Sequence, residues 1–406
     1  MPDAASDGTG SARSRAVAEP LRFGIFHPPY HPVGQSPTLA LERDLQLAEH
    51  ADMLGFDEMW FGEHHSGGYE ISGCPELMIA AAAQRTKRIR LGTGVNTLPY
   101  QHPLLIAERW VQLDHLTMGR AMFGAGPGAL VSDAKQLGID PLEQRRMMEE
   151  SLEAIMALID DIAPVTRETD WFQLHEARLN LRPYSYPRPD IRVSSAVSPS
   201  GPRVAGQWGL GLLSMGATSP RGFEALASSW QIVADRAAEF GQHVDRRRWS
   251  VVGPMHLAPT REQAREDVRF GVLDWYAYFT VAGGPTVPLS PPQDIEDGVD
   301  QIIASGLGVI GTPDDAIAQI QRLLDQSGGF GTYLLMTHSW ADWSATLKSH
   351  ELIARHVIPH FQGQLDRPRE RFERFASQKN AMHEHITAAR DKARSEHLAE
   401  RESRHE

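Results

Sequence analysis

The sequence predicts a single (β/α)₈ barrel, the TIM-barrel architecture, on three observations. Short apolar runs alternate along the chain with longer segments in which apolar residues recur every three to four positions. Eight such strand–helix pairs fit between residues 21 and 362. Gly, Ser, His, Asn and Pro concentrate where the apolar runs end, as they do on the loop-bearing face of a parallel barrel. With 406 residues, 41% of them hydrophobic, the chain can bury a core of that size.

Each predicted strand is a short apolar run bounded by Gly, Pro or polar residues. In chain order the runs are LRFGIF (21–26), FDEMWFGEH (56–64), IRLGTGV (89–95), AMFGAGPG (121–128), IRVSSAV (191–197), GLLSMG (211–216), RWSVVGPMHLA (248–258) and GTYLLMTH (331–338).

The helical segments between these runs carry start and stop signals. Apolar residues recur at helical spacing from 36 to 55, where Gly55 is a natural stop, and Pro75 suits the first turn of the next helix. The best-marked start is Thr312, an N-cap followed by Pro313 and by acidic residues in the first turn. Further helices are expected over 102–116, 142–161, 203–208 and 340–361.

Two insertions interrupt the barrel pattern. Residues 163–190 suggest a hairpin followed by a linker, and the Gly- and Pro-rich residues 283–298 suggest a mobile loop that could act as a lid. The barrel itself is therefore expected over 21–362, with these two segments outside the strand–helix alternation.

The two ends of the chain differ in composition from the barrel. Residues 1–20 are small and polar and lack the apolar stretch of a secretory signal, so we expect a disordered tail. Residues 363–406 are highly charged, with apolar residues at three- to four-residue spacing, which predicts a helical extension. That extension could dock on the barrel or on a second subunit, or it could remain a solvated helix.

The overall composition excludes several classes of protein. The net charge of −12, from 40 basic and 52 acidic residues, argues against a general nucleic-acid surface. The single cysteine, Cys74, permits no intrachain disulfide and fits a reducing compartment. No run approaches the roughly 20 apolar residues that a membrane span needs. We therefore expect a cytoplasmic protein without a nucleic-acid or membrane partner.

The second predicted strand ends in Glu63, His64 and His65, a combination that could bind a metal or exchange protons. Adjacent side chains on a strand point to opposite faces, so the two histidines are poorly placed to share one ion. A zinc site also needs three or four converging ligands, and the chain has no H-E-x-x-H motif or cysteine pair. No metal ligands are predicted, and capping or core hydrogen bonds are the plain alternative for either histidine.

The fourth strand ends in a glycine-rich segment, FGAGPG, at residues 123–128. It lacks the full G-x-G-x-x-G pattern, and Pro127 removes a backbone donor, so a Rossmann phosphate loop is not expected. Gly124, Gly126 and Gly128 could instead let a flat ligand approach the backbone closely. An ordinary glycine turn is the alternative.

The fifth strand leads into SPSGPRVAG, where Ser198, Ser200 and Gly201 precede a helical run. Backbone N–H groups at a helix N-terminus, together with two hydroxyls, form an anion site, and Arg203 could add a positive charge. The alternative is that the serines only cap the helix. A serine hydrolase is not indicated, because no G-x-S-x-G elbow stands at a strand end.

These strand ends, taken in order, resemble the bacterial luciferase-like flavin-dependent monooxygenases. The matching pieces, spread over residues 22–361, are FGIF, GFDEMWFGEHH, LGTGVNTLPYQHP, LTMGRAMFGAGPG, SPSGPRVAG and GTPDDAIAQI. The insertions and the MTHSWADW ending are most similar to the limonene monooxygenase-like branch. The fold of this family is the (β/α)₈ barrel that the strand count predicts.

The resemblance implies a two-component monooxygenase. Members take reduced flavin, FMN with FAD as the alternative, from a separate NAD(P)H-dependent reductase, and oxygen adds to it to form a peroxyflavin. That species oxygenates a small apolar substrate such as a terpene, ketone, aldehyde or secondary-metabolite intermediate, by epoxidation, hydroxylation or Baeyer–Villiger insertion. Homodimers are common in the family. The alternatives are a deazaflavin-dependent dehydrogenase, a non-catalytic flavin-binding protein and a metal-dependent hydrolase.

The resemblance also assigns site residues. His64 matches the histidine near the reactive face of the flavin and would donate or accept a proton. Gly94–Val95 matches an unusual cis peptide bond against which the flavin ring rests. Gly126 and Pro127 stand where bacterial luciferase has a cysteine and an arginine, so that arginine's role and light emission are not implied. The expected cofactor-binding residues are Gly94, Val95, Asn96, Gly126, Pro127, Ser198, Ser200, Gly201 and Met215. Apolar walls are expected from Phe26, Trp60, Leu98, Tyr100, Met215, Trp275 and Tyr278.

Overall fold

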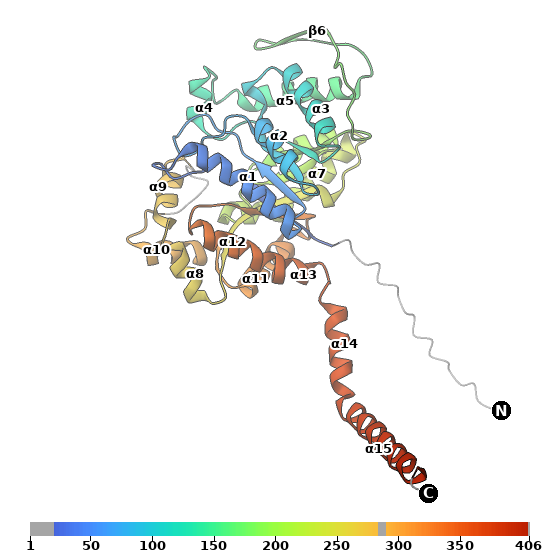
Figure 1. The fold of residues 1–406 in the computed structure, drawn as a ribbon. Helices are drawn as coiled ribbons and strands as arrows, with labels where there is room; N and C mark the ends of the chain where they lie inside the picture. The colour runs from blue at the N-terminus through green and yellow to red at the C-terminus, as the bar shows by residue number, and fades with distance from the viewer. Residues whose placement is uncertain (1–19, 283–289, 405–406) are drawn as a thin grey trace, which may run out of the picture.

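A computed structural model describes residues 20–282 and 290–404 of the chain. Eight parallel strands close into a ring surrounded by helices (Figure 1). The ring closes where the last strand returns to the first, with Phe26 opposite Met336. The barrel strands are β1 (Arg22–His27), β2 (Glu58–Phe61), β3 (Arg90–Thr97), β4 (Ala121–Gly126), β7 (Asp190–Ser195), β8 (Gly211–Ser214), β9 (Trp249–Leu257) and β11 (Thr332–Met336).

The eight predicted strands are these eight, so the barrel prediction is confirmed. A short ninth strand, β10 (Val309–Gly311), pairs with the last three residues of β9 and lies outside the ring. Its three residues are too few to produce a recognisable apolar run, which is why the sequence did not predict it. The predicted hairpin is present as β5 (Val165–Glu168) and β6 (Gln173–Ala177).

Helices cover the outside of the ring. Their ends follow local signals: Gly55 adopts the left-handed conformation after the first helix, and Thr312 forms a capping box with Asp315. Those around the ring are α1 (Pro37–Leu54), α2 (Pro75–Arg85), α3 (Pro103–Leu116), α4 (Val131–Gln136), α5 (Gln144–Asp160), α6 (Ser200–Trp208), α7 (Pro220–Glu239), α8 (Arg261–Val268), α9 (Val272–Ala282), α10 (Ile295–Ala304), α11 (Pro313–Ser327), α12 (Trp343–Leu352) and α13 (Ile358–Phe361). Short 3₁₀ or π turns occupy Leu98–Tyr100, Arg246–Arg248 and Ile353–Val357.

The residues expected to form a mobile loop, 283–298, lie partly outside the described chain, and Ile295–Gly298 form the first turn of α10. The loop prediction is wrong for that turn, because Asp294 caps the helix through the Asp297 amide. The predicted disordered tail, residues 1–20, also lies outside the described chain except for Pro20.

The charged C-terminal segment is helical, as predicted, and forms α14 (Asp366–Ser377) and α15 (Lys379–Ser403). These helices project away from the barrel (Figure 1), and no residue of either is buried. Docking on the chain's own barrel is therefore wrong, and docking on a second subunit stays a prediction beside a solvated helix. None of the helices between residues 20 and 404 has the length and apolarity required to cross a lipid bilayer.

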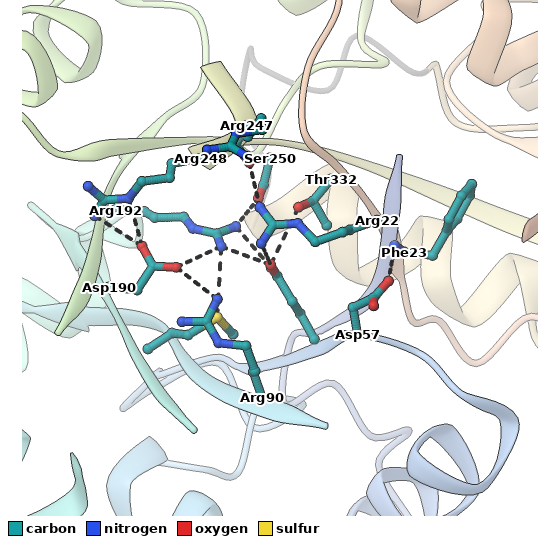
Figure 2. A network of polar contacts seen from close by, with 12 residues as sticks. Arg22, Phe23, Asp57, Arg90, Asp190, Arg192, Arg247, Arg248, Ser250 and Thr332 are labelled. Atoms are coloured by element: carbon teal, nitrogen blue, oxygen red, sulfur yellow. Dashed lines mark hydrogen bonds and ion pairs between the residues drawn. The ribbon is translucent and has the colours of Figure 1, made fainter. Parts of the chain in front are cut away.

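The inside of the barrel is layered along the strands. A network of polar contacts around Arg192 lies at its base (Figure 2). Fully buried Arg192 of β7 donates to both carboxylate oxygens of buried Glu58, at 2.8 and 2.9 Å. The same guanidinium donates to Asp190 at 2.9 Å and to the Ser250 hydroxyl. Burial alone would lower the pKa of Arg192, but the charges of Asp190 and Glu58 outweigh it and raise the pKa.

Two residues further along three of these strands the interior becomes apolar. Side chains two apart share one face of a strand, so the residues after Glu58, Ser250 and Thr332 on this face are Trp60, Val252 and Leu334. The buried members of this layer are Phe26, Trp60, Met122, Leu213, Val252 and Leu334. The carboxyl ends of the strands, beyond this layer, are where the sequence placed the functional residues.

Candidate active site

Three apolar side chains rest on the buried layer at the carboxyl ends of the strands. Val95 from β3, Met215 from the loop after β8, and Met336 from the end of β11 pack on it while remaining only partly buried. They therefore form an apolar floor that faces the mouth of the barrel. Met215 was predicted as a site residue, and the structure places it on this floor.

A break in the β3–β4 pairing brings Val95 into the mouth. The register shifts between Thr93 and Asn96, and the peptide bond between Gly94 and Val95 is cis, as the resemblance implies. A Cβ added to Gly124 would lie 2.9 Å from one Val95 methyl, and one added to Gly126 would lie 2.5 Å from the other. The glycines of the fourth strand are therefore needed to make room for Val95.

The helix N-terminus expected to bind an anion lies next to this break. A Cβ on Gly126 would also meet the Ser194 hydroxyl at 2.8 Å, and one on Gly201 would meet the Ser194 carbonyl at 2.5 Å. A continuous path of close contacts thus leads from the floor to the start of α6, through Val95, Gly126, Ser194 and Gly201. This path joins two motifs that are 106 residues apart in the sequence.

The serines at the start of α6 are held close together. The Ser198 hydroxyl lies 3.0 Å from that of Ser200 and accepts the Ser200 amide at 3.3 Å. Arg203, one turn into the helix, is exposed. The N-cap of α6 is Pro199, which makes no side-chain capping bond, and Ser198 before it accepts the first helical amide instead. The first-turn amides and two hydroxyls are a suitable arrangement for an anion.

His64 lies in the loop after β2, between two buried carboxylates. Its Nδ1 is 3.0 Å from Asp133 of α4, and its Nε2 is 3.4 Å from Glu70. The Ser66 hydroxyl donates to Asp133, and the Tyr278 hydroxyl donates to Glu70. Both carboxylates are thus fixed by a second donor, which orients the imidazole from each side.

The two carboxylates set the charge of His64. Burial alone would lower the pKa of His64, but the hydrogen bond to Asp133 and the charge of Glu70 outweigh it, so its pKa is raised. The pKa of Glu70 is raised because burial outweighs the charge of His64 and the Tyr278 hydrogen bond, which both act to lower it. An imidazole in this setting is favoured in its protonated form and can act as a proton donor.

Glu63 and His65 hold the loop after β2 in place. Buried Glu63 accepts the Thr97 amide at 3.0 Å and contacts His65 Nε2 at 3.1 Å. The loop after β2 is thereby tied to the end of β3. Because His64 and His65 bind different carboxylates, their nitrogens do not converge on one point, and they form no joint metal site.

The structure turns the side chain of one predicted cofactor residue, Asn96, away from the mouth. Asn96 is fully buried, donates to Glu76 at 2.9 Å, and accepts from the Trp110 indole at 2.7 Å. Its side chain supports β3 from the helix side. Pro127 is half-buried, and its carbonyl accepts from Gln144 at 2.8 Å.

Most of the residues expected to form the apolar walls of the site are core residues. Phe26, Trp60, Leu98 and Trp275 are at most 3% exposed and offer no surface to a ligand. Tyr278 is also buried, but its hydroxyl reaches Glu70, and Tyr100 remains half-buried with its hydroxyl accepting from Gln144.

Sequence reasoning missed the two acidic partners of His64. Asp133 is 69 residues from His64 in the chain and stands in an unremarkable polar segment, VSDAKQ. Glu70 is close in sequence but occupies a loop without periodicity. Only the folded barrel, which sets the loops after β2 and β4 side by side, reveals the pairing.

Comparison with known proteins agrees with this geometry. A model of the luciferase-like monooxygenase family matches residues 21–329. The chain belongs to the luciferase-like monooxygenase family, a family of barrel enzymes. The chain is 48% identical over 380 residues to limonene 1,2-monooxygenase of Rhodococcus erythropolis. The matched region covers 93% of this chain and 96% of that protein. The expected likeness to the limonene monooxygenase-like branch is thereby confirmed.

Two further relatives extend the comparison. The 4-hydroxyprotoasukamycin monooxygenase of Streptomyces nodosus subsp. asukaensis is 45% identical over 351 residues, covering 86% of this chain and 94% of that protein. Among solved structures, the oxygenating constituent of 3,6-diketocamphane monooxygenase from Pseudomonas putida, a type II Baeyer–Villiger monooxygenase in complex with FMN, superposes with a TM-score of 0.68. It is 27% identical, and the match covers 84% of this chain and 98% of that one.

Proposed function

We propose that this chain is the oxygenase component of a two-component flavin monooxygenase that acts on a small apolar substrate of the terpene class. The substrate class follows from the 48% identity to a protein named for limonene and from the apolar floor of the mouth. A separate NAD(P)H-dependent reductase would supply the reduced flavin. A homodimer in the cytoplasm goes with this proposal as the arrangement expected of the family.

The observation that carries the proposal is the path from Val95 through Gly126 and Ser194 to Gly201. This path joins the apolar floor to a helix N-terminus that carries two hydroxyls. Such an arrangement suits a ligand with a flat ring and a phosphate. FMN has these two parts, and FMN is bound in the 3,6-diketocamphane monooxygenase structure. FAD stays the alternative, because its proximal phosphate could occupy the same place.

Each part of the site has a proposed task. The bound reduced flavin would supply the activation of O₂ and the transfer of one oxygen atom. Val95, Met215 and Met336 would exclude water below the ring and receive the apolar substrate. Ser198, Ser200 and the first amides of α6 would hold the phosphate.

His64 would serve as the acid–base group. Asp133 holds its Nδ1 at 3.0 Å, which leaves Nε2 as the atom that exchanges a proton. Glu70 lies 3.4 Å from Nε2, which is long for a strong hydrogen bond, so a reacting group can compete for this nitrogen.

The proposed function can be tested by isotope labelling. The purified protein is supplied with FMN, NADH, a flavin reductase and ¹⁸O₂, and is offered limonene, other monoterpenes, cyclic ketones and aldehydes. We expect a product that carries one ¹⁸O atom, detected by mass spectrometry. Oxidation of a substrate under anaerobic conditions with an oxidised deazaflavin as the hydride acceptor, without label from oxygen, would contradict a monooxygenase and indicate the dehydrogenase alternative.

A further inference from the structure

A second cluster of ligating side chains lies on the other side of the β1 strand from the barrel interior. His27 ends β1, His31 follows in the next loop, and Asp44 lies on α1. Phe26 points into the barrel, so the adjacent His27 points outward, toward α1. One nitrogen from each histidine and one Asp44 oxygen all lie within 4.8 Å of one another.

The distances within this cluster suit a metal ion. His27 Nε2 lies 3.0 Å from Asp44 Oδ1, and His31 Nε2 lies 3.0 Å from Asp44 Oδ2. Around a four-coordinate ion with bonds of about 2.0 to 2.1 Å, neighbouring ligand atoms lie about 3.3 Å apart. Small adjustments of the side chains would therefore bring all three groups onto one ion.

His27 provides an independent observation that points to a ligand. It is 6% exposed, and its Nε2 is buried without a hydrogen-bond partner, although Asp44 is only 3.0 Å away. Its other nitrogen, Nδ1, lies 2.7 Å from the Thr337 hydroxyl. In the tautomer with Nδ1–H donating to Thr337, Nε2 carries a lone pair without a donor, and this lone pair is available to a cation held beside Asp44.

The surroundings leave room for a fourth ligand. The three side chains, together with Thr337, line a cavity of about 100 Å³ between α1 and the segment after β11. This is more than the volume of one water molecule, which is the usual fourth ligand where a protein supplies three. Arg43 also lines the cavity and lies over the ring of Trp343, 5.9 Å from its centre.

We propose that His27, His31 and Asp44 bind a divalent first-row transition metal such as Zn²⁺. Two imidazoles and one carboxylate are the ligands that these ions prefer over Mg²⁺ or Ca²⁺, whose sites are built of oxygen. The ion would tie the end of β1 to α1 and so clamp the first strand–helix unit of the barrel. The cluster is separate from the flavin mouth, and it revises the expectation that the chain has no metal ligands.

The test is a zinc titration of the full-length protein after treatment with EDTA and removal of the chelator. We expect one tightly bound equivalent of Zn²⁺, measured by elemental analysis and by competition with a chromophoric chelator. We expect Zn²⁺ to raise the Tm by several degrees. Cobalt in place of zinc should give the visible absorption of a four-coordinate site.

Matched variants separate this cluster from the other histidines. Asp44→Asn and His31→Gln should each lose the tight equivalent and the Tm increase. His175→Gln, at an exposed position of the hairpin, should keep both. The double variant His383→Gln/His385→Gln should also keep them, which excludes binding by the C-terminal helix.

Circular dichroism of each metal-free variant checks folding. If Asp44→Asn fails to fold, His31→Gln decides the question, because its side chain is on a loop and partly exposed. The proposal is overturned if wild type binds no tight zinc equivalent, or if folded His31→Gln binds zinc as wild type does.

Discussion

At the scale of single residues, the site is organised by His64 and the carboxylates on either side of it. The sequence predicted the histidine, because it ends a strand in a recognisable motif. It could not predict Asp133 or Glu70, since their contacts arise only when neighbouring loops meet at the barrel mouth. The same holds for Asn96, whose burial behind β3 depends on a contact with Trp110 that no local pattern signals.

The first prediction concerns the proton-transfer role of His64. His64→Ala should bind FMN as wild type does, but product formed per NADH oxidised should fall about 10²-fold, with hydrogen peroxide released instead. Product by chromatography and peroxide by a coupled assay measure this ratio. His65→Gln is the control, because the neighbouring histidine contacts Glu63 and should keep the coupling. Equal coupling in His64→Ala and wild type would refute the role.

The second prediction concerns the link between His64 and stability. The folded pKa of His64 is raised, so its stabilising effect is fully present below the unfolded pKa of about 6.5 and is lost as pH rises through the folded value. The pKa of Asp133 is lowered: burial opposes this, but the His64 and Ser66 hydrogen bonds prevail. The stabilising contribution of Asp133 is therefore present above its unfolded pKa of about 3.9, which includes the whole range in which His64 titrates.

Asp133→Asn should therefore destabilise the protein by about 1 to 3 kcal/mol at pH 5.5 and by less at pH 8.5. Urea unfolding at the two pH values measures the difference, and an NMR titration should show that the His64 pKa has fallen. A loss of stability that is the same at both pH values would show that the pair is not coupled as described.

At the scale of elements, the apolar runs predicted all eight barrel strands because each is buried on both faces and reads as a continuous apolar stretch. Elements without such a run were less predictable. Strand β10 has three residues, and the first turn of α10 was hidden in a segment rich in Gly and Pro. The break in β3 was expected only from the resemblance, since no local rule places it.

The third prediction tests the packing of Val95 against β4. Gly126→Ala would place a methyl 2.5 Å from a Val95 methyl and 2.8 Å from the Ser194 hydroxyl. Val95 and the start of α6 must therefore shift. We expect affinity for reduced FMN, measured by anaerobic titration, to fall at least tenfold, equivalent to about 1.4 kcal/mol.

Gly216→Ala is the matched control, because it adds the same methyl at the same end of the barrel with no atom closer than 3.6 Å. If both variants bound flavin as wild type does, Val95 and Gly126 would not be part of the cofactor site.

At the scale of the whole molecule, the barrel is built of layers: a charged base (Figure 2), an apolar middle, and a mouth at the carboxyl ends of the strands. The strand count predicted this architecture and the position of the mouth. It did not predict the base, because Arg192 and Glu58 are 134 residues apart, and charged residues in apolar runs carry no sign of their partners. The charged base fixes strands β2 and β7 far from the site chemistry.

The fourth prediction concerns that base. Arg192→Met leaves Glu58 and Asp190 buried without their shared cation and should cost about 3 to 5 kcal/mol of the free energy of unfolding. Affinity for flavin should stay unchanged in the folded fraction. Arg146→Met is the control: its partners lie on the surface and are screened by solvent, so the loss should be much smaller. Similar losses in both variants would contradict a special role for the buried network.

The central claim is that flavin binds at the barrel mouth across the path from Val95 to the start of α6. A crystal structure of the protein with FMN tests it most directly. We predict the flavin ring against Gly94–Val95, the phosphate within hydrogen-bond distance of Ser198, Ser200 or the first amides of α6, and His64 beside the ring. Electron density for FMN elsewhere on the molecule, with the mouth empty, would contradict the account.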